Sequence, residues 1–190
     1  LDLLDDEGWD GAAFDCDYIL HIASPFTIEE PKKESILIKP ALEGTLRALN
    51  AAKNSSKVKK VVLTSSMAAI AYGHDKQLCK PEDWTDTTKD VGAYVKSKTI
   101  AEKAAWEFIH SDNEPSFSMT TIHPGMVFGP LLSSDTDGAS AELLSKMING
   151  KFPALPDAYF TVVDVRDVAK LHVESLRNNK SDNKRIITTS

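Results

Sequence analysis

The sequence predicts an α/β fold, a mostly parallel sheet with helices on both faces. Short apolar runs rich in β-branched residues alternate with longer segments of helical period, as in a parallel sheet with crossover helices. The runs end in proline, glycine or hydroxyl residues, and 190 residues is the length of one globular domain. We therefore expect a single main core, without internal repeats or a domain linker.

Four short apolar runs are expected to form the sheet. They are too short for typical helices, and they cover residues 17–23, 59–65, 118–123 and 185–188. The first ends at Ser24-Pro25 and the third at Pro124-Gly125, because proline cannot donate to a strand ladder. The second delivers hydroxyl residues at its carboxyl end.

The segments between these runs carry apolar stripes at helical spacing. The predicted helices cover residues 35–53, 92–110, 140–149 and 165–178. Pro40 suits the first turn of its helix, or a kink if the helix starts earlier. Gly150 is expected to end the third helix, and Asp164 is a suitable N-cap for the fourth. The polar residues 72–92 form a long connection, which in a compact domain usually has a function.

The composition excludes several classes of protein. Hydrophobic residues at 42% and charged residues at 26% fit an ordinary folded domain, and no apolar run has the roughly 20 residues of a membrane span. A net charge of -6 argues against a nucleic-acid partner. Cys16 and Cys79 form no C-x-x-C pair, which argues against disulfides and a metal site. With an acidic N-terminus unlike a signal peptide, we expect a cytoplasmic protein; the missing initial methionine leaves a processed or truncated start open.

Tyr94 and Lys98 are the most informative pair. They lie one turn apart on a predicted helix, so their side chains share a face and can share a ligand. A fixed ammonium within about 4 to 6 Å of a phenol favours its charged form and eases proton exchange. The alternative is a surface lysine below a packed tyrosine, because this spacing often arises by chance.

Further candidates follow three of the predicted strands, at the edge where ligands bind in open α/β sheets. A hydroxyl of Thr64, Ser65 or Ser66 can hydrogen-bond a substrate carbonyl, although capping and turn formation are more common uses. Residues 23–25 and 124–125 can line a flat cofactor, or simply end their strands. In combination, these groups predict a ligand site.

Five stretches of the chain carry a resemblance to a known family. They are residues 21–26 (HIASPF), 62–66 (VLTSS), 94–98 (YVKSK), 123–130 (HPGMVFGP) and 163–169 (VDVRDVA). Together they resemble the extended short-chain dehydrogenases/reductases, and within them the dihydroflavonol 4-reductase, cinnamoyl-CoA reductase and aldehyde (methylglyoxal) reductase branch. The resemblance covers nearly the whole chain.

The resemblance implies a carbonyl reductase or alcohol dehydrogenase that uses NADP(H) rather than NAD(H) and acts on a small or aromatic ketone or aldehyde. Tyr94 would be the general acid or base, Lys98 would hold the nicotinamide ribose and lower the tyrosine pKa, and Ser66 would polarise the carbonyl. The implied cofactor-binding residues are Asp2, Leu3, Ala23, Ser24, Pro25, Thr64, Ser65, Tyr94, Lys98, Pro124, Gly125, Met126 and Val127.

The resemblance also implies a substrate pocket and a quaternary structure. Phe26, Met67 and residues 131–138 fall where this branch shapes its pocket, and parts of the pocket extend over about residues 131–163. A homodimer paired through the helix at 92–110 is expected from relatives. The predicted unit is thus one partial NAD(P)-binding domain over residues 1–190.

The sequence departs from the family pattern in two places. It has no G-x-x-G-x-x-G or G-x-G-x-x-G motif. In the family, this glycine-rich turn binds the cofactor pyrophosphate, and the residue that distinguishes NADP from NAD follows it in the chain. We expect a fragment or an incompletely traced chain rather than a degenerate relative. Ala41 stands where many relatives have an asparagine, so a proton relay there must use backbone and water.

Two other functions stay open. An NAD-dependent nucleotide-sugar epimerase or dehydratase shares the Ser/Tyr/Lys set, but residues 23–26 and the lack of asparagine at 124–128 favour the reductase branch. A non-catalytic dinucleotide sensor is possible on the same fold. Such a protein has no need of Ser66, Tyr94 and Lys98 together.

Overall fold

The computed structural model describes residues 1–27, 29–111, 115–132, 139–151 and 160–189. Its larger sheet has four strands in the order β1-β2-β3-β6. These are β1 (Tyr18–His21), β2 (Lys60–Thr64), β3 (Ser118–Pro124) and β6 (Lys184–Thr188). All neighbouring pairs are parallel, as the sequence predicts.

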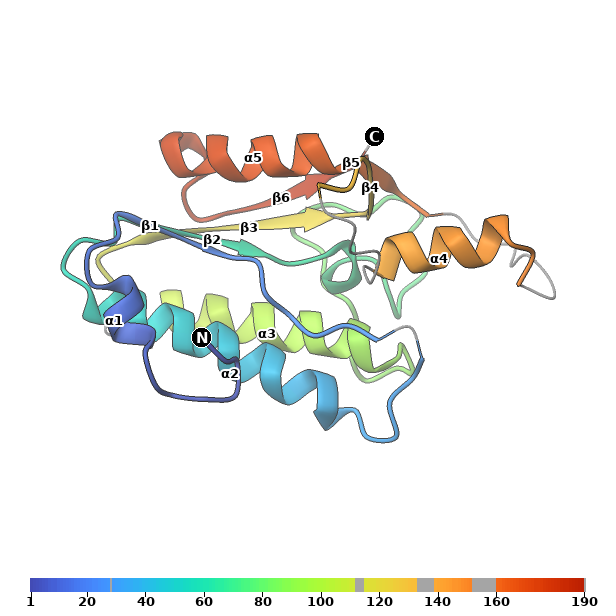
Figure 1. Ribbon diagram of the computed structural model, residues 1–190, viewed down its shortest axis with the longest axis horizontal. Coiled ribbons are helices and arrows are strands. Elements are labelled where there is room, and N and C mark those ends of the chain that lie inside the picture. Colours follow the sequence, from blue (N-terminus) through green and yellow to red (C-terminus); the bar gives the residue numbers. More distant parts are fainter. Residues whose placement is uncertain (28, 112–114, 133–138, 152–159, 190) are drawn as a thin grey trace.

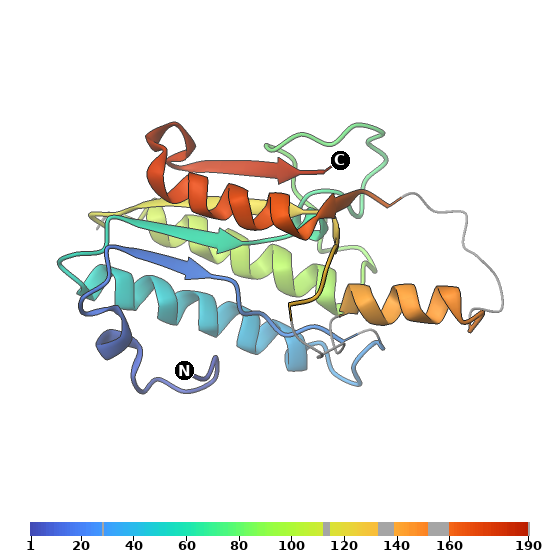
Figure 2. The ribbon, with the colours of Figure 1, turned by 45° about the horizontal axis from the view of Figure 1, so that its top comes forward.

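Helices cover both faces of this sheet, which confirms the predicted fold class. The long helices α2 (Ser35–Asn54) and α3 (Ala93–Ile109) pack together on one face, and α5 (Val165–Arg177) lies on the other (Figure 1). Turning the molecule shows the same layers, with α4 (Ala139–Ile148) beyond the carboxyl ends of the strands (Figure 2). The short helix α1 (Trp9–Ala13) precedes β1.

The strand register brings the carboxyl ends of the strands to one edge. His21 is level with Leu63, Thr64 with Ile122, and Pro124 with Thr188. Parallel strands that end level with one another expose the following residues side by side. The candidate segments after β1, β2 and β3 therefore meet at this edge.

A single apolar cluster fills the space between the sheet and the helices α2 and α3. Its fully buried members come from both layers and include Leu49, Ala52, Val61, Ala105 and Met119. The alanines let α2 and α3 approach the sheet closely. The small-residue face predicted for residues 92–110 is therefore part of the core.

Met119 tests how tightly this core is packed. Its side chain is 0% exposed, so we expect Met119→Ala to lower the free energy of unfolding by about 2–5 kcal/mol through lost burial and a new cavity. Urea unfolding of the full-length protein measures this change. Met147→Ala, on the exposed side of α4, is the control and should change stability by no more than about 0.5 kcal/mol. Equal effects of the two variants would contradict the assignment of the core.

Asp164 and Gly150 mark the ends of their helices as predicted, and Pro40 takes the second of its two expected places, inside a helix that starts earlier. The Asp164 side chain caps α5 by accepting from the Arg166 backbone N–H at 2.8 Å. Gly150 ends α4 at a φ of 63°, a conformation that favours glycine. Pro40 lies inside α2 rather than in its first turn, because the helix already begins at Ser35. It cannot donate the helical hydrogen bond to residue 36.

A second, two-stranded sheet was not predicted. It pairs β4 (Met126–Phe128) with β5 (Val162–Asp164), and three-residue strands are too short to show a period of two. Gly125 joins this sheet to β3 at a tight crossing. A Cβ atom on Gly125 would lie 2.4 Å from the carbonyl oxygen of Thr161, so the close approach requires glycine.

The long connection between β2 and α3 begins with the 3₁₀ turn η1 (Met67–Ala69), and a similar turn, η2 (Asn179–Ser181), precedes β6. The predicted substrate loop at 131–138 lies mostly outside the described residues, as does part of the predicted pocket region up to residue 163.

Candidate active site

Tyr94 and Lys98 point from the first turns of α3 toward the end of β2. Ser66 directly follows β2, where its Oγ accepts from the Ala68 backbone N–H at 3.1 Å and so caps η1. The hydroxyl of Ser66 also lies close enough to the Tyr94 phenol to lower the pKa of that phenol. The structure thus brings together two of the three predicted catalytic side chains directly, and the third lies one turn along the same helix.

The electrostatics of Tyr94 differ from the sequence-based expectation. Burial raises the pKa of the phenol and nearby Tyr72 raises it further, whereas the hydrogen bond from Ser66 lowers it. The expected lowering by Lys98 is not seen. The ammonium group of Lys98 is directed toward the backbone instead, because Nζ donates to the carbonyl oxygen of Thr64 at 3.2 Å.

Lys98 itself has an unusual pKa. Its side chain is almost fully buried, and burial lowers its pKa to about 8, while the Glu102 carboxylate one turn away acts in the opposite direction. The ammonium therefore holds and releases its proton much closer to neutral pH than an ordinary lysine does. This is a property suited to a group that binds a ligand hydroxyl or exchanges a proton with it.

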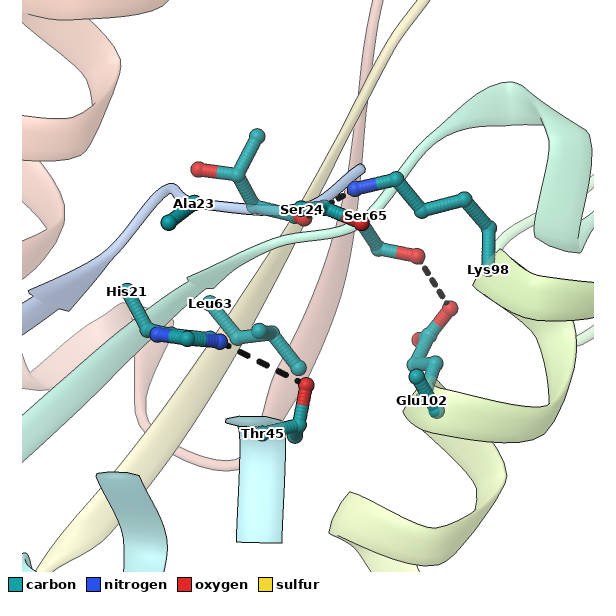
Figure 3. A pocket seen from close by; sticks show the side chains of 10 residues that line it. His21, Ala23, Ser24, Thr45, Leu63, Ser65, Lys98 and Glu102 are labelled. Atoms are coloured by element: carbon teal, nitrogen blue, oxygen red, sulfur yellow. Dashed lines mark hydrogen bonds between the residues drawn. The ribbon is translucent and has the colours of Figure 1, made fainter. Parts of the chain in front are cut away.

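Lys98 lines a small cavity at the carboxyl end of β1 and β2 (Figure 3). The volume of about 10 Å³ has room for roughly one water molecule. The residues around it come from β1, β2, α2, α3 and the segments that follow the strands: His21, Ala23, Ser24, Thr45, Leu63, Thr64, Ser65, Lys98, Ala101 and Glu102. Polar side chains thus converge on a narrow space from several elements.

One orphaned group in this cavity fits a hydroxyl-bearing ligand. The Oγ of Ser24 is buried and has no hydrogen-bond partner within the described residues, and the same is true of Thr188 Oγ1 at the end of β6. Buried polar atoms are normally paired, so an unpaired one at a sheet edge indicates a missing partner. A cofactor ribose laid over the strand ends, next to Lys98, would supply one.

The three hydroxyls after β2 have separate partners. His172 Nδ1 donates to the Val168 carbonyl of its helix, which leaves Nε2 as an acceptor. The Thr64 hydroxyl therefore donates to His172 Nε2, at 2.7 Å. Ser65 donates to Glu102 at 2.7 Å. Only Ser66 faces the phenol of Tyr94. Its choice over Ser65 as the catalytic candidate therefore has a geometric basis. The hydroxyls of Thr64 and Ser65 are occupied by His172 and Glu102.

The remaining cofactor candidates fall in two places. Pro124, Gly125, Met126 and Val127 continue β3 into β4 at the same sheet edge, beside Thr188. Ala23 and Pro25 follow β1 there.

Asp2 and Leu3, by contrast, lie against α2 and away from the catalytic candidates. The Leu3 side chain packs on Gly44, and its carbonyl accepts from Arg47 Nη1 at 2.6 Å. Asp2 closes a turn by accepting from the Leu4 N–H at 2.8 Å. Their role at an adenine stays a prediction. Phe26 stands edge-on against the ring of Tyr94, with centroids 4.6 Å apart, and so lies beside the candidate site as expected.

Sequence reasoning missed a buried carboxylate below the site. Glu102 is 1% exposed and accepts from Ser65, from His123 Nε2 at 2.8 Å and from Arg185 Nε at 2.8 Å. Burial opposes its ionisation, but His123 and Arg185 outweigh that and hold the pKa of Glu102 well below its ordinary value. The signal in the sequence was its spacing of four from Lys98, which places it on the same helix face.

The pH dependence of folding stability tests whether His21 is buried beside Lys98 in the folded protein. Burial and the charge of Lys98 lower its pKa from 6.5 to about 4. Between these values the unfolded chain binds a proton that the folded chain does not, so stability falls as the pH falls through this window. The loss attributable to His21 is roughly 3 kcal/mol. Urea unfolding across the window should show it in the wild type and not in His21→Gln; identical pH profiles would contradict this prediction.

Within the described ranges, no group of three or more His, Cys, Asp or Glu side chains is arranged to hold a metal ion. Among the helices of the same residues, none combines the length and apolarity needed to cross a bilayer.

The fold is that of a Rossmann-type α/β protein, with a parallel sheet and helices on its two faces. Its candidate site is a Ser/Tyr/Lys set at the strand ends, formed by Ser66, Tyr94 and Lys98. The chain belongs to the NAD dependent epimerase/dehydratase family, whose model matches residues 1–188. This confirms the resemblance to extended short-chain dehydrogenases/reductases on which the site residues were chosen.

Several reductases are similar to the chain. It is 40% identical to cinnamoyl-CoA reductase CAD2 of Medicago truncatula, with 93% of this chain and 55% of that protein covered. It is 34% identical to the NADPH-dependent methylglyoxal reductase GRE2 of Saccharomyces cerevisiae, with 92% and 56% covered. The crystal structure of the yeast methylglyoxal/isovaleraldehyde reductase Gre2 complexed with NADPH superposes with a TM-score of 0.86 at 31% identity, covering 99% of this chain and 61% of that one. The chain therefore spans a little more than half the length of these relatives.

Proposed function

We propose that this chain forms the greater part of the NADP(H)-binding domain of a carbonyl reductase or alcohol dehydrogenase that acts on a small or aromatic ketone or aldehyde. The observation that carries the proposal is the meeting of Ser66, Tyr94 and the buried ammonium of Lys98 at the carboxyl edge of a parallel sheet. The names of the similar cinnamoyl-CoA and methylglyoxal reductases support the same chemistry.

The cofactor would be NADP(H), as in the yeast Gre2 structure. Lys98 and the unpaired Ser24 hydroxyl would hold the nicotinamide ribose. Residues 23–25 and 124–127 would line the cofactor through their backbone, with Thr64 and Ser65 beneath it. Asp2 and Leu3 would lie at the adenine. Phe26, Met67 and the segments within residues 131–163 would contribute to the substrate pocket.

Each catalytic side chain then has a defined task. The bound nicotinamide supplies the hydride for the carbonyl carbon. Tyr94 donates its proton to the carbonyl oxygen, or accepts it in the reverse direction, and its high pKa in this structure keeps the phenol protonated for the reduction. Ser66 is fixed by its cap to Ala68, and with a carbonyl compound bound its proton would turn from the phenol to the same oxygen. Lys98 would hold the nicotinamide ribose beside Tyr94.

We also propose a cytoplasmic homodimer without a nucleic-acid partner. The acidic composition supports the absence of a nucleic-acid partner, and α3 is the helix through which a second subunit would pair.

The test of the function is a cofactor-oxidation assay. The full-length protein is mixed with NADPH or NADH and a panel of aldehydes and ketones, and absorbance of the reduced cofactor is followed with Tyr94→Phe as control. Oxidation of NADPH with one or more carbonyl compounds is the expected result. Tightly bound NAD that persists through purification, with no net oxidation, would instead support an epimerase or dehydratase. No oxidation of either cofactor by a protein that also retains no bound NAD would reject both enzymes.

A further inference from the structure

The long connection between η1 and α3 is fastened to the core by one arginine. Arg185, from β6, donates through Nη1 to the carbonyl oxygens of Pro81 and of Asp83, the latter at 2.6 Å. Its guanidinium also stacks on the ring of Trp84, 3.7 Å from the centroid. Residues 81–86 are called the strap below.

The same guanidinium also forms an ion pair with the buried carboxylate of Glu102. Nε lies 2.8 Å from one carboxylate oxygen and Nη2 lies 3.3 Å from the other, a two-pronged contact. His123 Nε2 and Ser65 Oγ donate to the same carboxylate. Arg185 therefore joins the strap to a buried network that includes the residue next to Ser66.

The strap in turn holds η1. The backbone N–H of Thr85 donates to the Ala69 carbonyl at 3.0 Å, and its hydroxyl donates to the Ala68 carbonyl at 2.7 Å while accepting from the Tyr72 N–H at 3.1 Å. Thr85 is 1% exposed, so no water competes for these bonds. The position of η1 is thus set by Thr85.

The position of η1 sets the direction of the Ser66 hydroxyl. Ser66 Oγ accepts from the Ala68 N–H, which ties one lone pair of the oxygen to η1 and leaves the proton for another acceptor. If η1 shifts, this bond turns the side chain with it. Ser66 is held from a second side because Ser65 is anchored on Glu102. Both restraints lead back to the pair of Glu102 and Arg185.

We propose that Thr85 and Arg185 are positioning residues for Ser66: through the strap they fix η1, and through η1 they aim the Ser66 hydroxyl at the phenol of Tyr94. The proposal rests on the proposed reductase function only for its kinetic test. A buried ion pair adds little net stability compared with apolar residues of the same volume. The contacts of Arg185 instead connect β6 with α3 and the strap, and we infer that they serve to place these elements precisely.

The kinetic test replaces Thr85 by valine, which keeps the shape and removes the hydroxyl. We expect kcat for carbonyl reduction with NADPH to fall roughly 10- to 100-fold, because small misplacements of catalytic groups are costly. The dissociation constant of NADPH should not change. Thr85→Ser restores the hydroxyl and should restore kcat, and Arg185→Lys should lower kcat in the same way as Thr85→Val.

The matched control is Thr120→Val. Thr120 is equally buried, and its hydroxyl donates from β3 to the Ser181 carbonyl at 2.7 Å, but it makes no contact with Glu102, the strap or η1 among the bonds of the described residues. Its kcat should stay at the wild-type value although its stability falls. In a Ser66→Ala background, Thr85→Val should have no further effect on kcat. A wild-type kcat for Thr85→Val, an equal loss for Thr120→Val, or a full additional loss without Ser66 would each overturn the proposal.

A second measurement does not need enzymatic activity. The hydrogen bond from Ser66 lowers the pKa of Tyr94, so a misaligned Ser66 should leave that pKa higher. Ultraviolet difference titration, with Tyr94→Phe subtracted in each background, reports the pKa of this one phenol. An increase in Thr85→Val and none in Thr120→Val supports the proposal even if the protein reduces no carbonyl compound. An unchanged pKa in Thr85→Val would reject it, whatever becomes of the proposed function.

Discussion

Tyr94→Phe is expected to lower kcat/KM for carbonyl reduction by about 10²- to 10⁴-fold, the usual contribution of a positioned general acid. The substitution removes only the hydroxyl. The ring stays edge-on against Phe26, and the backbone of α3 is untouched, so folding and cofactor binding should be preserved. The phenol is the only proton donor that Ser66 contacts directly among the described side chains.

Steady-state kinetics with NADPH and the best carbonyl substrate measure this loss, with the melting temperature as a control for folding. Tyr72→Phe is a suitable companion variant, because Tyr72 influences the charge of Tyr94 but has no assigned role in proton transfer. Full activity of Tyr94→Phe would remove the basis for the proposed mechanism. A similar loss in Tyr72→Phe would mean that the proton comes from a different phenol.

Ser66→Ala should have the second largest effect, a fall in kcat of about 10²- to 10³-fold, which is typical for the loss of one donor aimed at a developing oxyanion. The same change removes the cap of η1, so we also expect a stability loss of about 0.5–2 kcal/mol. The two effects can be separated because Ser66→Asn keeps a capping side chain and loses the hydroxyl. Asparagine should recover stability but not kcat.

Ser66 and Tyr94 lie next to each other, and groups that act as a unit show non-additive kinetics. The double variant Ser66→Ala/Tyr94→Phe should therefore be scarcely slower than Tyr94→Phe alone. Single-turnover measurements would exclude a change in product release as the cause. If the two losses simply multiplied, Ser66 and Tyr94 would be acting on different steps.

Most of the architecture was predictable because it depends on local pattern. The runs that became β1, β2, β3 and β6 are β-branched and short, and the stripes of α2, α3 and α5 have helical spacing. A parallel sheet then brings the strand ends together by geometry alone. The meeting of Ser66 with Tyr94 follows from that arrangement and from the family resemblance.

The parts that were missed depend on contacts distant in sequence. The strands β4 and β5 are stabilised by each other, and neither has enough residues to show its own period. The partners of Glu102 come from β2, β3 and β6, so no spacing rule could assemble them. The pKa of Tyr94 was misjudged because a spacing of four residues places Lys98 on the right face but does not say to which acceptor its ammonium points.

The crowding at Gly125 is relevant to anyone who wishes to redesign the pocket. The main sheet and the small sheet are joined at a point where even a methyl group would strike the Thr161 carbonyl, so a substitution there forces the two sheets apart. Saturation libraries should therefore leave Gly125 unchanged. Diversity is better introduced a few residues later, at Leu131 and Leu132, whose side chains are exposed and whose replacement displaces no backbone.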